Sequence, residues 1–194
     1  MREAICIDGE RLWRTVERSG EIGVGRPGGL VRLALSEADR EMRDLFVRWC
    51  REAGCSVTID RLGNIFARRA GSEPDLSPVL IGSHLDTQVN GGKYDGILGV
   101  LAGLEVIRTL NDHGVITRRS IEVVEAKRLG VPTLDIASQA GQDAYHMSKV
   151  GPTAMIFTPC RDGVTHNKHE HAEMSRTVPG ANVLLHAVLA RATR

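Results

Sequence analysis

The stretch IGSHLDTQVNGGKYDG, residues 81–96, joins a short apolar run to a glycine-rich turn. The apolar residues VLIGS, 79–83, predict a strand of the kind that is buried on both faces of an α/β sheet. The sequence ILGVLAGLEVIRTLNDHG, 97–114, follows with helical spacing and closes on a glycine. Ligands of open α/β sheets bind beyond the carboxyl ends of the strands, so the polar residues of this turn are candidates for a site.

The sequence on either side predicts the same class of fold. Upstream, helices are expected at 9–19 and 37–53, with Asp8 and Ser36 as N-caps, followed by a hairpin of CSVTID and NIFARR. Downstream, strands are expected in RSIEVV and TAMIFTP, a helix near GQDAYHMSKVG, and an amphipathic helix over 180–194. Strands that alternate with helices predict an α/β fold, built as a three-layer α/β/α sandwich.

The composition argues against several classes of function. The chain has 194 residues, a net charge of +1 and 4% aromatic residues, which gives no support for nucleic acid or a membrane surface as a partner. No segment approaches the roughly 18 apolar residues of a membrane span, and the N-terminus does not resemble a signal peptide. Four cysteines without a CxxC pair are expected as reduced thiols, which favours a cytoplasmic protein.

Three side chains in the opening stretch suit a metal ion. His84 follows the predicted strand, Asp86 lies on the same side of an extended segment, and Asp95 closes the Gly-Gly turn. A carboxylate behind a ligating histidine fixes its tautomer, and Asp95 could bridge two cations. Imidazole and carboxylate ligands suit zinc, manganese or cobalt. The same residues also fit a hydrogen-bonded histidine and an ordinary helix N-cap, so the spacing alone leaves both interpretations open.

A second histidine-rich stretch, GVTHNKHEH, covers residues 163–171. His166 lies just beyond a predicted strand and a glycine, so it is a better ligand candidate than His169 or His171. The alternative is a solvated polar loop. Cys160 also follows the predicted strand, but no Cys-His-Asn order supports a nucleophile.

The stretches GSHLDTQVNGGKYDG, ASQAGQDAYHM and GPTAMIFTPCRDGVTHNKHE together resemble one family. It is that of the zinc-dependent N-carbamoyl-L-amino-acid and allantoate amidohydrolases, hydantoinase/carbamoylase-type enzymes of the two-metal aminopeptidase and carboxypeptidase superfamily. The resemblance implies a three-layer catalytic domain with an inserted lid and dimerisation domain. It also implies two divalent metals, zinc or else manganese or cobalt, and a water that a glutamate activates to attack a carbamoyl, ureido or amide carbon. His84 then resembles a ligand of the first metal, Asp86 the catalytic carboxylate that orients it, Asp95 the bridging ligand, and His166 a ligand of the second metal.

The chain also departs from the family pattern. After Val124 the family has an Asn-Glu-Glu-Gly turn, whose glutamates supply the general base and a metal ligand, whereas this chain continues as EAKRLGVP. A later His-Ile-Glu-Gln segment and the lid domain, with its homodimer interface, have no counterpart. Gln142 stands where the family has a histidine. Residues 1–194 are thus expected to form one split catalytic domain, with parts 1–124 and 125–194 joined where the lid and the Glu-Glu segment would be inserted.

Three hypotheses follow for the function. Each metal would keep two protein ligands, one fewer than a catalytic zinc site normally has. The chain is then a truncated hydrolase of linear C–N bonds in small ureido or carbamoyl substrates, such as N-carbamoyl-L-amino acids or allantoate, with little or no activity. The alternative is a non-catalytic metal- or ligand-binding remnant of the fold. A third possibility is a minimal hydrolase that recruits Glu125 or His146, with Glu125 a weak candidate for the missing base.

Overall fold

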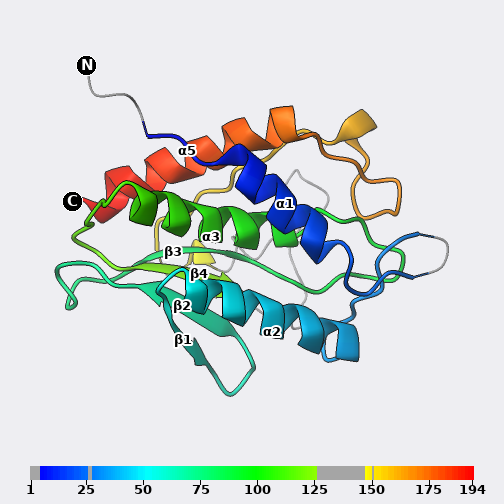
Figure 1. The fold of residues 1–194 in the computed structure, drawn as a ribbon, viewed down its shortest axis with the longest axis horizontal. Helices are drawn as coiled ribbons and strands as arrows, with labels where there is room; N and C mark the ends of the chain where they lie inside the picture. Colours follow the sequence, from blue (N-terminus) through cyan, green and yellow to red (C-terminus); the bar gives the residue numbers. More distant parts are fainter. Residues whose placement is uncertain (1–4, 26–27, 126–146, 150) are drawn as a thin grey trace.

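The computed structural model describes residues 5–25, 28–125, 147–149 and 151–194, and it has the mixed α/β fold that the sequence predicts (Figure 1). Four strands form one sheet in the order β1-β2-β4-β3, with bounds Ser56–Ile59 for β1, Ile65–Arg69 for β2, Val79–Ser83 for β3 and Ile121–Glu125 for β4. β2 pairs antiparallel with β1 and β4, whereas β3 and β4 pair parallel. The carboxyl ends of β3 and β4 therefore meet at one edge of the sheet.

The described residues include four α-helices: α1 (Gly9–Ser19), α2 (Glu37–Glu52), α3 (Ile97–Asp112) and α5 (Met174–Ala192). Helix α3 packs on β3 and β4, and both α1 and α5 pack against α3 (Figure 1). Helix α2 covers β1 and β2. None of the helices within the described ranges is long and apolar enough to cross a bilayer.

The N-termini of α1 and α2 begin at the residues that the sequence predicts. The Asp8 carboxylate accepts a hydrogen bond of 2.9 Å from the Arg11 amide, and the Ser36 hydroxyl accepts one of 3.2 Å from the Asp39 amide. Each cap satisfies an amide that the helix itself cannot pair. The Asp39 carboxylate in turn accepts from the amide of Leu35, one residue before the cap.

Helix α3 lies at the centre of the core. Its residues Val100, Leu104 and Ile107 are fully buried, and they share the core with Ile81 and Val123 of the sheet. Burial of each such side chain stabilises the fold by about 1.5–3 kcal/mol. Since α3 starts directly after the turn that carries Asp95, this packing also fixes the position of the turn.

Three expectations from the sequence need correction. In β3 only Ile81 is buried and Leu80 is 46% exposed, so the strand is not buried on both faces. Residues 153–159 form no strand, and Phe157 is 68% exposed, because an apolar segment becomes a strand only when it finds a sheet edge to pair with. The terminal helix begins at Met174 rather than near 180, and it runs through Pro179. The helix expected near 141–151 falls mostly outside the described residues.

Candidate metal centre

The three candidate ligands come from two loops beside the carboxyl end of β3. His84 follows the last residue of β3, and Asp95 lies two residues before the start of α3. His166 comes from the loop between the short 3-10 helix Arg161–Gly163 and α5. The structure therefore brings His166 to a turn that lies far from it in the sequence.

Both histidines face the carboxylate of Asp95. The Nε2 atom of His84 lies 3.9 Å from Asp95 Oδ2, and the Nε2 atom of His166 lies 3.5 Å from Asp95 Oδ1. Two ligand atoms on one tetrahedral zinc, each at about 2.0–2.2 Å, stand roughly 3.4 Å apart. The two pairs are close to that spacing, and they use different oxygens of Asp95, as a carboxylate shared by two cations would.

The imidazole of His84 is held in one orientation. Its Nδ1 lies 3.0 Å from the backbone carbonyl of Asp86 and 3.3 Å from the Asp86 carboxylate. Because a carbonyl oxygen only accepts hydrogen bonds, Nδ1 carries the proton and Nε2 keeps its lone pair toward Asp95. Burial by itself lowers the pKa of His84, but the hydrogen bond to the Asp86 carboxylate, together with the charges of Asp86 and Asp95, outweighs it and raises the pKa above its ordinary value.

The backbone around Asp95 leaves room for this imidazole. Gly96 has a φ of +71°, and a Cβ built there would lie 2.3–2.5 Å from the ring atoms of His84. Gly96 is also the N-cap residue of α3, and no side chain caps that helix. The ordinary explanation of Asp95 as a helix N-cap is therefore wrong, and its carboxylate points to the histidines instead.

The backbone of His166 adopts a strained conformation. Its φ is +57°, in the left-handed region that costs a residue with a side chain about 1–2 kcal/mol. Both of its backbone groups are held: the amide donates to Glu170 at 3.1 Å, and the carbonyl accepts from the side-chain amide of Gln88. Strain of this kind persists where surrounding contacts impose it, as they do in many functional sites.

Two buried charged residues support the site, and neither stands out in the sequence. Glu170, 6% exposed, accepts hydrogen bonds from both loops of the site. Arg32 is fully buried, and its guanidinium donates a hydrogen bond of 2.7 Å to the carbonyl of Leu85. Leu85 is the residue between His84 and Asp86 in the sequence. Burial lowers the pKa of Arg32 to about 10, so the side chain stays charged at neutral pH. The only sequence signal for Glu170 is its place four residues after His166.

The remaining candidate residues stay apart from this group. His169 is exposed, and the ring of His171 packs edge-on against Tyr94. The backbone of Glu125 ends β4 opposite Ser83, while its side chain lies outside the described part of the structure. Gln142 and His146 also fall outside the described residues. Within the described ranges, no group of three or more histidine, cysteine or acidic side chains is placed to hold a metal ion.

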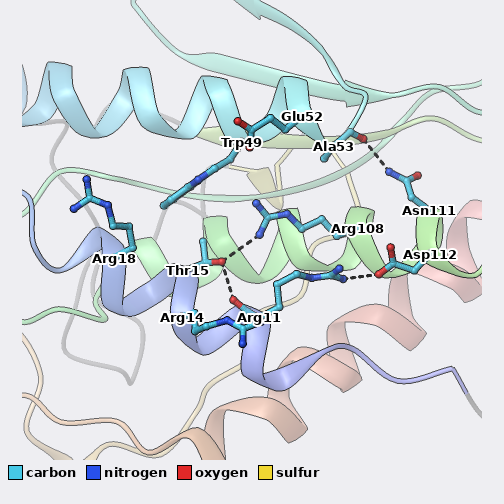
Figure 2. Close-up of a pocket in the computed structure, with 10 residues that line it drawn as sticks. All are labelled: Arg11, Arg14, Thr15, Arg18, Trp49, Glu52, Ala53, Arg108, Asn111 and Asp112. Carbon is cyan, nitrogen blue, oxygen red and sulfur yellow. Dashed lines mark hydrogen bonds and ion pairs between the residues drawn. The ribbon is translucent and has the colours of Figure 1, made fainter.

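One hollow of the described structure lies elsewhere, between α1, α2 and α3 (Figure 2). It measures about 540 Å³, and its charged lining includes Arg11, Arg14, Arg108 and Asp112. Arg108 lies eleven residues along α3 from Ile97, which is roughly 16 Å from the end that carries Asp95. Within this groove Arg11 forms an ion pair with Asp112, and the Arg108 guanidinium donates a hydrogen bond to the hydroxyl of Thr15. This groove is therefore separate from the histidine cluster.

Comparison with known proteins agrees with the motifs. The model of peptidase family M20/M25/M40 matches residues 123–190. The N-carbamoyl-L-amino-acid amidohydrolase of Rhizobium meliloti is 50% identical over 117 residues, which are 60% of this chain and 28% of that protein. The crystal structure of a hydantoinase/carbamoylase family amidase from Burkholderia multivorans matches with a TM-score of 0.62 and 54% identity, over 63% of this chain and 30% of that one. The chain is thus similar to hydantoinase/carbamoylase family amidases, and its residues 123–190 match peptidase family M20/M25/M40.

This similarity confirms the resemblance seen in the sequence, and it covers only part of each relative. The ureidoglycolate hydrolase of Arabidopsis thaliana is 30% identical over 146 residues, which are 73% of this chain and 31% of that protein. The chain therefore spans about 30% of the length of the relatives it matches. These matches support the fold, whereas the activity of the whole relatives does not pass to this chain without further argument.

Proposed function

We propose that this chain carries part of a divalent-metal centre for the hydrolysis of linear C–N bonds in small carbamoyl or ureido compounds. One observation carries the proposal: the Nε2 atoms of His84 and His166 approach the two oxygens of Asp95, at 3.9 and 3.5 Å. Relatives named N-carbamoyl-L-amino-acid amidohydrolase and ureidoglycolate hydrolase indicate the class of substrate.

The side chains have distinct roles in this proposal. Asp95 would bridge two cations, with His84 on the first and His166 on the second. Asp86, through its carbonyl and carboxylate beside Nδ1, keeps the Nε2 lone pair of His84 directed at the site. Bound zinc, manganese or cobalt would polarise the substrate carbonyl and lower the pKa of a water.

The same set of candidate metal ligands supports a low hydrolytic activity. In this proposal each cation would have two protein ligands, Asp95 and one histidine, whereas a catalytic zinc normally has three. The loss of a general base costs about a hundredfold to ten-thousandfold in rate. We therefore expect metal binding with little or no turnover, and the alternative function is a metal- or ligand-binding remnant. We further propose that parts 1–124 and 125–194 form one split domain, because α5 of the second part packs against α1 and α3 of the first. All four cysteines are thiols, which supports a cytoplasmic location.

A hydrolysis assay tests this function. Purified chain with zinc, manganese or cobalt is incubated with N-carbamoyl-L-amino acids and with allantoate, beside Asp95→Ala and a metal-only blank. We expect no product above the blank. Turnover that Asp95→Ala abolishes would contradict the low activity while supporting the site. If Glu125→Ala abolished such turnover as well, the chain would be a minimal hydrolase that uses Glu125 as its base.

A further inference from the structure

The buried carboxylate of Glu170 connects the two loops of the candidate metal centre. Its Oε1 atom accepts hydrogen bonds from the amides of Tyr94, at 3.1 Å, and Asp95, at 2.9 Å. Its Oε2 atom accepts from the amide of His166, at 3.1 Å, and from the hydroxyl of Thr165, at 3.2 Å. One side chain therefore bonds directly to the backbone of the bridging candidate and to that of a histidine candidate.

All four partners of Glu170 are hydrogen-bond donors in this arrangement. A carboxylate offers about four lone-pair sites on two oxygens, so its capacity is filled. A neutral amide of the same size has one accepting oxygen and an NH₂ group that would face donors. The site thus selects a carboxylate over its isosteric amide.

The turn before Asp95 is shaped to admit this carboxylate. A Cβ built on Gly92 would lie 2.5 Å from the Cδ atom of Glu170, so glycine is required there for the close approach. On the other side, the hydrogen bond to Oε2 helps to hold His166 at its left-handed φ of +57°. Both ligand candidates therefore depend on the same group for their backbone positions.

We propose that Glu170 is the positioning residue of this centre, which sets Asp95 and His166 at the spacing that a shared cation needs. Glu170 faces the backbone and not the space between the ligands, so it acts through them. The proposal rests on the proposed function for the metal, while the connection between the loops stands on the hydrogen bonds alone. A carboxylate that orients metal ligands typically changes metal affinity by about 10–100-fold when it is replaced.

The test compares Glu170→Gln with Glu173→Gln, an acidic residue of the same segment whose side chain is 45% exposed. Metal-stripped protein is titrated with Co²⁺, and both the affinity and the visible absorption of the bound ion are recorded. Amide hydrogen exchange is followed in the absence of metal at Tyr94, Asp95 and His166. We expect Glu170→Gln to lower the Co²⁺ affinity about 10–100-fold, to change the absorption spectrum, and to lose protection at these three amides. Glu173→Gln should match the wild type in all three measurements.

The outcomes separate this proposal from the proposed function. If the wild type binds no Co²⁺, the metal centre is wrong, and hydrogen exchange alone decides whether Glu170 holds the two loops. If Glu170→Gln does not fold, Thr165→Val removes one donor to Oε2 and should lower the affinity about threefold, as expected for one ordinary hydrogen bond. Unchanged affinity and protection in Glu170→Gln, or in Thr165→Val as its substitute, would overturn the positioning role.

Discussion

The ion pair between Arg11 and Glu105 gives the sharpest test of how the helices are held together. Glu105 of α3 is fully buried, and the Arg11 guanidinium reaches it from α1 with contacts of 2.7 and 2.9 Å. The hydrogen bond to Glu105 raises the pKa of Arg11 above its ordinary value. Replacement of Arg11 by methionine would leave a buried carboxylate without its partner.

The expected loss is about 3–5 kcal/mol, the usual cost when one member of a buried pair is removed. The second contact of Arg11, with the half-exposed Asp112, adds at most about 1 kcal/mol. The charge of Glu105 also acts on Arg108, which partly replaces the lost cation. We therefore expect the lower half of the range, about 3–4 kcal/mol, out of the 5–15 kcal/mol of a typical domain.

Urea denaturation at pH 7, followed by circular dichroism, measures the free energy of unfolding. Arg14→Met is the matched control, since Arg14 is exposed on the same helix and its replacement should change stability by less than about 0.5 kcal/mol. The double variant Arg11→Met with Glu105→Met should recover most of the loss, because a buried pair can be replaced by apolar residues at little cost. An Arg11→Met variant as stable as Arg14→Met, or a double variant as unstable as the sum of the single ones, would refute this reasoning.

Three further predictions concern Gly96 in the turn beside His84, the cysteine thiols and the N-cap of α2. Gly96→Ala forces a Cβ into the imidazole of His84 and a left-handed φ on alanine, so we expect a loss of at least about 1 kcal/mol in urea denaturation and weaker metal binding in calorimetry. Burial raises the pKa of Cys55 to about 11, which leaves about one thiolate in a thousand at pH 8. Cys55 should therefore resist a thiol reagent until urea unfolds the protein, while the exposed Cys6 reacts at once; equal rates would contradict this. Ser36→Ala should lower stability by about 1 kcal/mol through loss of the cap, and an unchanged denaturation midpoint would count against that cap.

Local signals explain why much of the fold could be predicted from the sequence. The caps Asp8 and Ser36 and the hairpin of β1 and β2 each depend on residues within a few positions of one another, and the structure confirms them. Residues 153–159 could not be judged in this way, because their apolar content gives a preference for strand while pairing depends on an edge elsewhere in the sheet. The exposure of Leu80 in β3 likewise depends on which parts of the sheet other elements cover, and the sequence of the strand does not determine this.

The candidate site also combines residues that the sequence could predict with residues that it could not. His84 and Asp95 share one short stretch, so their chemistry was visible in the sequence. The buried positions of Glu170 and Arg32 were not, since glutamate and arginine side chains are mostly exposed in proteins and nothing in the sequence marks these two as exceptions. The structure also changes the meaning of Asp95, because Gly96 takes the N-cap position that a carboxylate often fills.

The central claim is that His84, Asp95 and His166 form a cation site, and calorimetric titration of the metal-stripped chain with zinc and manganese tests it most directly. The variants are His84→Ala and Asp95→Ala, with His169→Ala as the control because His169 is exposed outside the cluster. We predict saturable binding in the wild type and in His169→Ala, and its loss in His84→Ala and Asp95→Ala. A wild type without saturable binding, or equal binding by all four proteins, would contradict the account.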